Sequence, residues 1–580
     1  MLSSLGTQIP FSYRYLNICR DSIPLRPNET FTELLSGTRA EYTSFLLDMN
    51  FNESCKISCE KKFSKKDIKK FKWFIDRDYF FNFYLDSLPA GYSSTDMYTN
   101  ETVTTFYQGI PIGFVSNDTY FIYNHYIIYV DINKKDDKFQ IVGFSIEPVS
   151  VEQKTIDICE SLVIENGGDY FRDFNNFYAQ ELIEDDVLFT YDVVFKLSDK
   201  TFSSRWDRYI RKGKEYHWLG LLFANIILFL FSFLVIYILS RAIKKNIEIY
   251  NSNTIIEDNI IDEFGRKQVC NDVFRKPKNL ILFSCFIGTG FELLLIIMVS
   301  LIYNVIGFIH PERRGNLLNQ MVICFCIMSI FGGYVSTYIY KNNDGKLWLK
   351  NALVTTFLFP GISLIILIIV RILFSLESSS VGFKISEIAL LVILWICIST
   401  PLVLLGSFFA IKRKRIKYPC KINKLPTSIG VKPWYLKLKY ITWLTGLIPF
   451  SAIFIEFIYL LGYMWRYQVF YLASFLTLSI IFLVILSSEI SIIFIYLNLN
   501  RGDYNWWWKS FFVSASPSLY ILILSVYYFL YLNISRFTAI LVYFLIMGLI
   551  SVIAALVCGS CGVIFTFYFL YFIYSKIKVD

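Results

Sequence analysis

Long apolar runs in the second part of the chain constrain the fold more than any other feature of the sequence. The clearest is "WLGLLFANIILFLFSFLVIYILS", Trp218 to Ser240, in which Asn225 is the only strongly polar residue. An α-helix rises about 1.5 Å per residue, so a run of this length spans a hydrocarbon core about 30 Å thick. The run therefore predicts a transmembrane helix.

Eight further apolar runs are long enough to span a membrane. They begin near Asn279, Leu317, Asn351, Ile385, Tyr440, Gln468, Lys509 and Ala539. The composition agrees, because 55% of the 580 residues are hydrophobic and only 18% are charged. We therefore predict an α-helical polytopic membrane protein, with nine transmembrane helices in residues 217–580 and a short C-terminal tail.

The basic residues predict how these helices are oriented. The segments 241–278, 341–350, 412–439 and 499–509 and the tail hold about 25 Lys and Arg, whereas the four alternate loops hold about 5. By the positive-inside rule the basic side is cytosolic, so residues 1–216 are lumenal or extracellular and Asp580 is cytosolic. The net charge of +9 thus reflects orientation in the bilayer, and no nucleic-acid partner is predicted.

Asparagine sequons agree with this orientation, because glycosylation acceptors lie on the lumenal side. Four sequons fall within residues 1–216 and none in a predicted cytosolic loop; they begin at Asn28, Asn52, Asn100 and Asn117. These asparagines are candidate glycosylation sites. A fifth sequon, at Asn533, lies in a short loop close to the membrane, and we expect it to be unmodified.

The region 1–216 is mixed and polar and is long enough to bury its own core. "SKKDIKKFKWFIDRD" (64–78) predicts a helix whose first turn is capped by Ser64 and Asp67. Four stretches have strand character: 79–86, 120–132, 139–148 and 187–197. We predict an N-terminal β-rich lumenal domain. Since "MLSSLGTQIP" has no signal-peptide pattern, we also expect the natural start to lie upstream.

Four cysteines lie in this region, where an oxidising compartment favours disulfides. They are Cys19, Cys55, Cys59 and Cys159. The short spacing of Cys55 and Cys59 suggests one local bridge between them. The chain has only three histidines, none beside this pair, so no metal site is predicted.

Motifs in both parts of the chain resemble the transmembrane 9 superfamily, the nonaspanins. They include "TQIPFSYRYLNIC" (7–19), "VGFSIEP" (142–148), "NDVFRKP" (271–277), "LFPG" (358–361), "GLIPFSAIFIEFIYLL" (446–461) and "SEISIIFIYLNLNRGDYNWWWKSFF" (488–512). The resemblance implies a multi-pass protein of Golgi and endosomal membranes. It also implies a function in protein localisation to membranes, by sorting or escorting transmembrane cargo proteins toward the cell surface.

The C-terminal residues Lys578 and Asp580 resemble the Golgi-retention signal of this family. The resemblance implies that a vesicle coat complex binds the tail. Such recognition needs a cation and a carboxylate at a free chain end on the cytosolic face, as the predicted orientation provides. The alternative is a basic tail that only follows the positive-inside rule.

Three carboxylates fall inside predicted spans: Glu292, Glu456 and Glu489. Carboxylates in hydrocarbon are costly, so each needs a partner, a cavity or a proton. We favour the interpretation that they are hydrogen-bond donors that fasten helices and contact cargo. In the alternative function, a transporter or channel for a small solute or ion, they would be relays. Arg371, near the end of the fourth span, is expected to snorkel to the surface.

Three consecutive tryptophans, Trp506, Trp507 and Trp508, lie between the seventh and eighth spans. Successive side chains on a helix point about 100° apart, so three adjacent indoles cannot share one buried face. The headgroup layer surrounds a helix on all sides and suits indole. We therefore predict that the triplet anchors the chain in the cytosolic interface.

No nucleotide-binding loop, metalloprotease motif or hydrolase elbow occurs in the sequence. We therefore expect no catalytic activity and no cofactor. The expected partners are the lipid bilayer, transmembrane cargo proteins and the coat complex at the tail.

Overall fold

The computed structural model describes most of the chain. The described residues are 2–4, 6–20, 41–96, 103–135, 138–152, 163–166, 169–172, 178–209, 214–251, 271–307, 316–379, 385–420, 426, 437–465 and 473–576. Lys578, Asp580, Asn28 and Asn100, named above as candidate functional residues, lie outside these ranges.

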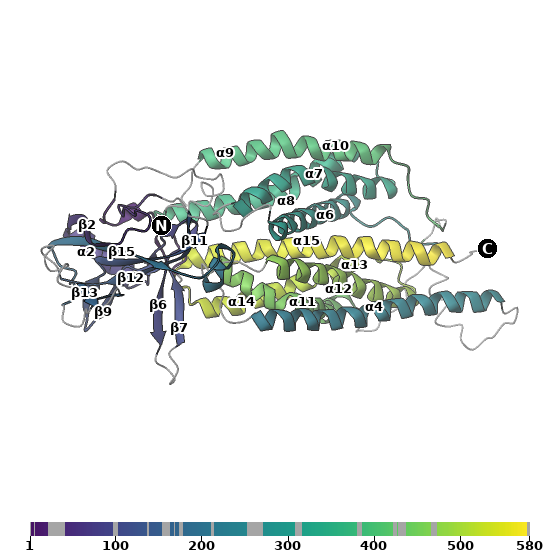
Figure 1. Ribbon diagram of the computed structural model, residues 1–580. Coiled ribbons are helices and arrows are strands. Elements are labelled where there is room, and N and C mark those ends of the chain that lie inside the picture. The colour runs from purple at the N-terminus through teal and green to yellow at the C-terminus, as the bar shows by residue number, and fades with distance from the viewer. Residues whose placement is uncertain are drawn as a thin grey trace.

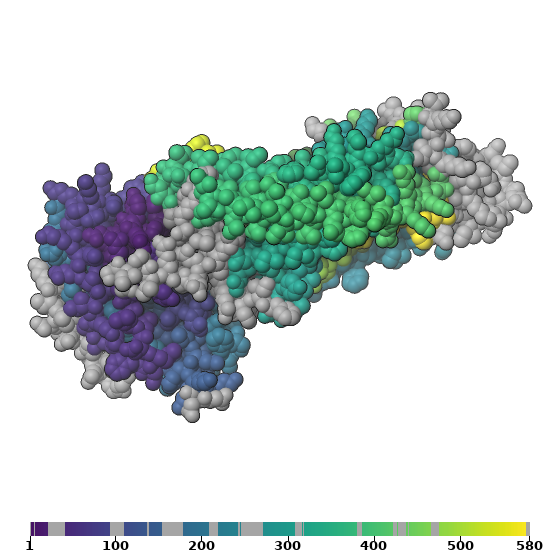
Figure 2. Space-filling model, turned by 90° about the horizontal axis from the view of Figure 1, so that it is seen from above, coloured from purple at the N-terminus to yellow at the C-terminus, as the bar shows by residue number. Residues whose placement is uncertain are grey.

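A β-rich head and an elongated helical bundle make up the molecule (Figure 1). The head comprises the described residues up to 209, and the bundle extends from α4 (Lys214–Asn251) to α15 (Phe537–Lys576). The head covers one end of the bundle, here called the head end (Figure 2). Helix α15 ends at the opposite end, here called the far end (Figure 1).

The main sheet of the head has four strands in the order β12-β11-β15-β2. Their bounds are Glu53–Lys62 (β2), His125–Lys135 (β11), Lys138–Val149 (β12) and Asp186–Leu197 (β15). β11 runs parallel to β15, and the other neighbours are antiparallel. Buried and exposed side chains partly alternate along β11, which explains why its sequence has strand character.

Short strands complete the head. They form a three-stranded sheet of β1 (Leu2–Ser3), β3 (Phe80–Phe81) and β8 (Ile110–Pro111), and the pairs β4 (Tyr84–Leu85) with β5 (Leu88–Pro89), β6 (Gly91–Asp96) with β7 (Val103–Gln108), β9 (Gly113–Ser116) with β10 (Thr119–Ile122), and β13 (Val163–Asn166) with β14 (Asp169–Arg172). Two 3-10 helices are η1 (Tyr13–Tyr15) and η2 (Phe202–Tyr209).

The predicted helix of the head is α2 (Lys65–Ile75). Ser64 and Asp67 form the predicted capping box, in which each side chain accepts a hydrogen bond from the other residue's backbone N–H. The strand predicted over 120–132 is divided into β10 and β11. Asn124 lies between them, and its buried amide exchanges hydrogen bonds with the backbone of Val151.

The predicted Cys55–Cys59 disulfide is wrong. Cys59 is bonded to Cys19, and Cys55 is disulfide-bonded to another cysteine. Both Cys55 and Cys59 lie on β2, where four residues at about 3.3 Å each span about 13 Å. That separation exceeds the Cα distance of about 7 Å that a disulfide can bridge.

Nine helices among the described residues are long and apolar enough to cross a membrane. Besides α4 and α15 they are formed by α6 (Leu280–Ile306), α7 (Asn316–Asn342), α8 (Trp348–Leu376), α9 (Ile385–Leu394) with η4 (Trp395–Ser399) and α10 (Thr400–Lys412), α11 (Leu438–Trp465), α12 (Ala473–Asn500), and α13 (Trp507–Ser514) with α14 (Pro517–Leu532). The predicted polytopic helical architecture with a β-rich N-terminal region is confirmed.

The fifth and eighth spans consist of more than one segment. In the fifth, a π-helical turn, η4, separates α9 from α10, and Pro401 lies in the first turn of α10. In the eighth, Pro517 begins α14 after α13 ends. Proline suits the first turn of a helix because the N–H it lacks would have no intrahelical partner there.

Helix α15 runs through the middle of the bundle (Figure 1). It packs against α6 and α8 on one side and against α12, α13 and α14 on the other. The other helices thus form two groups, α6 to α10 and α4 with α11 to α14, and α15 joins them.

The N-terminal segment joins the head to the bundle. The Gln8 side chain donates a hydrogen bond to the Trp465 carbonyl (2.7 Å), and the Ser535 N–H donates to the Gly6 carbonyl (3.2 Å). Tyr79 of the head holds the same segment, because its hydroxyl donates to the Ile9 carbonyl (3.0 Å). Burial raises the pKa of Tyr79 to about 12, so it remains a neutral donor.

Candidate functional site

The tryptophan triplet binds another part of the chain. The indole N–H groups of Trp506, Trp507 and Trp508 donate to the carbonyls of Val273, Arg275 and Lys278, at 2.8, 2.9 and 2.8 Å. Trp506 is 1% exposed and Trp507 is 6% exposed. The three indoles therefore clamp the segment 271–278, which precedes α6, onto the start of α13; we call this contact the tryptophan clamp.

The predicted anchoring of the triplet in the headgroup layer is thus wrong for Trp506 and Trp507, because both are buried. Helical periodicity does not govern Trp506, which precedes the first residue of α13. Its ring stacks on that of Trp507, with centroids 4.0 Å apart. The receiving segment is non-helical, so successive carbonyls are available to side-chain donors.

Charged residues of both segments support the tryptophan clamp. Buried Asp503 forms an ion pair with Lys509, and Asp272 pairs with Arg275 at 2.6 Å. Gly502 (φ +78°) ends α12: its N–H donates to the Leu499 carbonyl, and the Asp503 N–H donates to that of Asn498. This Schellman motif requires a left-handed residue, which explains the glycine.

A third loop joins this layer at the far end. The ring of Tyr418, which follows α10, stacks on Phe274 with centroids 5.0 Å apart. The Tyr418 hydroxyl donates to the carbonyl of Asn342 at the end of α7 (3.3 Å). Burial raises the pKa of Tyr418 to about 12, so the hydroxyl remains protonated.

Helix backbones approach closely where glycines lie in the bundle. A Cβ atom on Gly406 of α10 would lie 2.0 Å from the Ile330 carbonyl oxygen of α7, and one on Gly290 of α6 would lie 2.1 Å from that of Leu556 in α15. No side chain fits at these two crossings. Small residues at helix crossings are typical of association in membranes.

Hydroxyl and amide groups bond across other helix interfaces of the bundle. Ser491 of α12 contacts Ser510 of α13 (2.8 Å) and Thr566 of α15 (3.1 Å). Between α6, α7 and α8, Asn351 accepts from Ser284 (2.6 Å) and donates to Ser336 (2.9 Å). These buried groups satisfy one another where water has no access.

The three intramembrane carboxyls lie on different helices. Glu489 of α12 accepts a hydrogen bond from the Ser232 hydroxyl of α4 at 2.5 Å and so joins these helices. Glu456 is buried on α11. Glu292 of α6 lies against Gly332 of α7, where a Cβ atom would be 2.3 Å from the carboxyl oxygen.

Arg371 does not snorkel to the surface. It is buried and forms an ion pair with buried Glu387 of α9 at 3.3 Å. A charge near a span end needs no partner if it reaches water, so the sequence alone favours exposure. Sequence analysis does not single out Glu387, in the first turn of α9, although opposite charges at adjacent ends of two consecutive spans indicate such a pair.

A proline explains a second contact between the fourth and fifth spans. Pro360 of α8 has no N–H, so the carbonyl of Thr356 loses its intrahelical partner. The indole of Trp395, in the π-helical turn η4, donates to that carbonyl at 3.2 Å. This hydrogen bond therefore joins the carbonyl freed by Pro360 to the π-helical turn.

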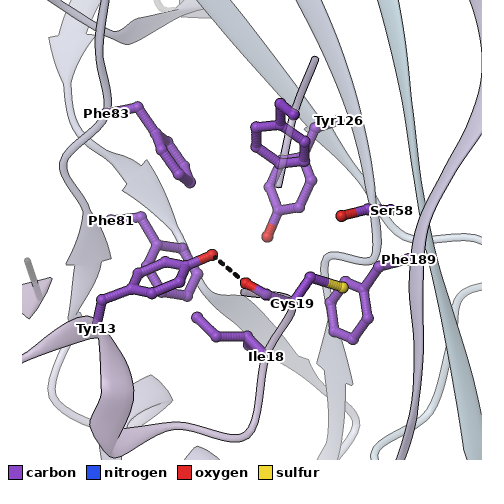
Figure 3. Close-up of a pocket in the computed structure, with 9 residues that line it drawn as sticks. Tyr13, Ile18, Cys19, Ser58, Phe81, Phe83, Tyr126 and Phe189 are labelled. Atoms are coloured by element: carbon purple, nitrogen blue, oxygen red, sulfur yellow. Dashed lines mark hydrogen bonds between the residues drawn. The ribbon is translucent and has the colours of Figure 1, made fainter. Parts of the chain in front are cut away.

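The head contains an aromatic pocket beside the Cys19–Cys59 disulfide (Figure 3). It is lined by Tyr13, Ile18, Cys19, Phe45, Ser58, Phe81, Phe83, Tyr126 and Phe189. The Tyr13 hydroxyl donates to the Cys19 carbonyl (3.2 Å), so the main polar group is already engaged. Burial raises the pKa of Tyr13 above its ordinary value.

Two predicted glycosylation sites lie among the described residues. Asn117 is exposed at the tip of the β9–β10 hairpin, where it adopts a left-handed conformation (φ +48°). Asn52 is exposed just before β2, and its side-chain oxygen accepts a hydrogen bond from the Phe195 N–H. Both are accessible, and their glycosylation stays a prediction.

Comparison with known proteins agrees with this architecture. A family model described as Endomembrane protein 70 matches residues 10–537. Transmembrane 9 superfamily member 10 of Arabidopsis thaliana is 31% identical across 100% of this chain and 93% of its own length. The chain belongs to the transmembrane 9 superfamily.

Two human members of the transmembrane 9 superfamily have about the same sequence identity to this chain. Member 4 is 29% identical and member 2 is 30% identical, across 100% of this chain and 93% and 90% of their own lengths. The family model begins in the head and ends at the first residue of the last span, so superfamily membership covers both parts of the molecule. No solved structure matches the chain.

The tryptophan clamp predicts unequal effects of two conservative substitutions. Trp506→Phe leaves the buried Val273 carbonyl without its donor, which costs about 1–3 kcal/mol of stability. Trp508→Phe frees the more exposed Lys278 carbonyl, which water can satisfy, and costs less than about 1 kcal/mol. Thermal unfolding of the full chain in lipid nanodiscs measures both. Equal losses for the two variants would contradict the clamp.

Proposed function

We propose that this chain sorts or escorts other transmembrane proteins toward the cell surface from Golgi and endosomal membranes. In this proposal residues 1–216 form a lumenal domain, and residues 217–580 form the nine-span domain with a cytosolic tail. The family description, Endomembrane protein 70, supports a location in internal membranes. The protein acts by binding rather than by catalysis.

The Arg371–Glu387 ion pair carries the proposal. A buried charge pair inside a membrane domain is costly and marks a functional site more often than a structural one. It lies between α8 and α9, which expose many of their apolar side chains. The exposed residues include Ile365, Ile369, Ile372, Leu390 and Ile393. Lipid or the transmembrane helix of another protein can cover this surface.

The chemistry of this surface suits a transmembrane helix that contains polar or small residues. Lipid tails are as apolar as leucine, so helices associate in the membrane through close packing and hydrogen bonds. The guanidinium of Arg371 and the carboxylate of Glu387 are buried, so in this proposal a cargo helix reaches their donors and acceptors by displacing the side chains that cover them. A cargo helix with a matching polar group would gain contacts there that lipid cannot provide.

The contact between α8 and the π-helical turn η4 supports a function for the same two spans. Single π-helical turns are rare and occur frequently at functional sites. Trp395 of η4 packs edge-on against Phe357 of α8 (centroids 5.2 Å) and donates to the Thr356 carbonyl. These contacts join η4 to α8, and the ion pair joins α9 to α8 nearer the head end.

The cargo proposal predicts that each of two single substitutions weakens cargo binding. It also predicts that the effect of the double variant differs from the sum of the two single effects. Arg371→Glu and Glu387→Arg each place two like charges together, whereas the double variant restores an ion pair of opposite polarity. Proximity labelling of membrane proteins from the head measures the effect. We expect each single variant to lose about tenfold of the labelled cargo.

The double variant separates recognition from folding. Recovered thermal stability with cargo still absent supports direct recognition by the charges, because the polarity has changed. Recovered stability together with full cargo labelling shows that the pair has only a structural role and contradicts the proposed site.

Localisation gives an independent prediction. We propose that a vesicle coat complex binds Lys578 and Asp580, which requires both side chains at the cytosolic chain end. Lys578→Ser removes the cation and should shift the protein from the Golgi toward later compartments, as seen by fluorescence microscopy. Lys576→Ser is the matched control, because it also removes one positive charge from the end of the chain but keeps Lys578 and Asp580. An unchanged Golgi distribution of the Lys578→Ser variant would contradict the proposal.

A further inference from the structure

Helices α6 and α7 pack antiparallel along a seam in which every fourth residue faces its counterpart. A Cβ atom on Gly288 would meet Ser336, and one on Gly332 would meet Glu292, so 288 faces 336 and 292 faces 332. The same register, continued toward the head end, pairs 296 with 328, 300 with 324, and 304 with 320. The seam therefore contains polar residues at several depths.

The head end of the seam contains buried polar groups for which the described part of the chain provides no partner. Among the described residues, no hydrogen bond of ordinary geometry is made by the Ser300 hydroxyl, the Asn304 amide nitrogen or either polar atom of the Gln320 side chain. Ser300 is fully buried, and the group beside its hydroxyl is the Cys324 thiol, a weak hydrogen-bonding group. An unpaired polar group in hydrocarbon costs several kcal/mol, so these groups require a ligand that both donates and accepts hydrogen bonds.

Water fits this requirement. Asn304 and Ser300 are one helical turn apart along α6, about 6 Å. One water molecule that forms a hydrogen bond of about 2.8 Å to each side chain spans almost that distance. Both levels lie at the head end of α6, within two turns of its last residue, Ile306. A compact cation site would instead need several oxygens around one point.

Glu292 lies deeper in the same seam. It is 6% exposed, and within the described part of the chain its carboxyl makes no hydrogen bond or ion pair. The titratable groups that act on it are the thiols of Cys285 on α6 and Cys326 on α7, and no charged side chain described on α8, α10, α12 or α15 does so. Without a counter-ion, a buried carboxyl is accommodated once a proton neutralises it.

One apolar level separates Glu292 from the unpartnered groups. It is formed by buried Ile296 and half-buried Met328. On the other side of Glu292, the close contact of Gly288 with Ser336 closes the seam, and Ser336 is already bonded to Asn351. The seam is thus polar toward the head end, apolar for one turn, and closed toward the far end.

We propose that water enters the α6–α7 seam from the head end and delivers a proton to the carboxylate of Glu292, with Ile296 and Met328 as the barrier. A hydronium ion transfers its proton to the carboxylate and leaves as water. Because the far end is closed, the seam binds a proton and does not conduct it. This inference is independent of the cargo proposal, which concerns α8 and α9.

Infrared spectroscopy of the full chain in lipid vesicles tests the proton site. The protonated carboxyl of Glu292 gives a C=O band that loses intensity as the pH rises and shifts in D₂O. Glu292→Gln should remove this band. Glu489→Gln is the matched control, because Glu489 is another intramembrane carboxyl but lies at the α4–α12 contact, and it should leave the band in place. A titrating band that survives Glu292→Gln would overturn the proposal.

The rate of the D₂O shift tests the path. Ile296→Ala removes the barrier and should speed the shift about tenfold, since hydrophobic constrictions control entry by dewetting. Gln320→Leu replaces an unpartnered amide by an apolar group of similar size and should slow the shift about tenfold. Leu556→Ala, which truncates a buried side chain of α15, controls for general loosening of the bundle. Equal rates in wild type, Ile296→Ala and Gln320→Leu would overturn the path.

Discussion

Close approach of helix backbones holds the membrane part of this protein together, and the other features depend on it. Lipid tails compete fully for apolar side chains, so burying leucine between helices gains little in a bilayer. Gly406 and Gly290 bring their helices against the carbonyls of Ile330 and Leu556. Each crossing increases the number of van der Waals contacts that lipid cannot replace, and the hydroxyl clusters at other interfaces add hydrogen bonds between helices.

The two ends of the bundle are held differently, by hydrogen bonds to backbone carbonyls of non-helical segments and of a helix end. At the far end the indoles of the tryptophan clamp hold the segment before α6. At the head end Gln8 donates to the Trp465 carbonyl, and the Ser535 N–H donates to that of Gly6.

The features that are predictable from sequence depend on local chemistry. Span length follows from apolar length alone, and α2 follows from the capping box of Ser64 and Asp67. The errors arise where distant segments meet. Cys55 and Cys59 are close in sequence but far apart on a strand, and the strand character of "SCKISC" argues against their pairing. The tryptophan triplet resembles a lipid-surface anchor because its partner is more than two hundred residues away.

One comparison of two glycine substitutions tests the central claim about backbone approach. Alanine favours a helix over glycine by about 1 kcal/mol, so Gly548→Ala, where a Cβ atom meets nothing within 4 Å, should leave stability unchanged or raise it. Gly406→Ala places a methyl group against the Ile330 carbonyl and should lower stability by about 1–3 kcal/mol. Thermal unfolding of the full chain in nanodiscs gives both values. Equal stability of the two variants would contradict the account.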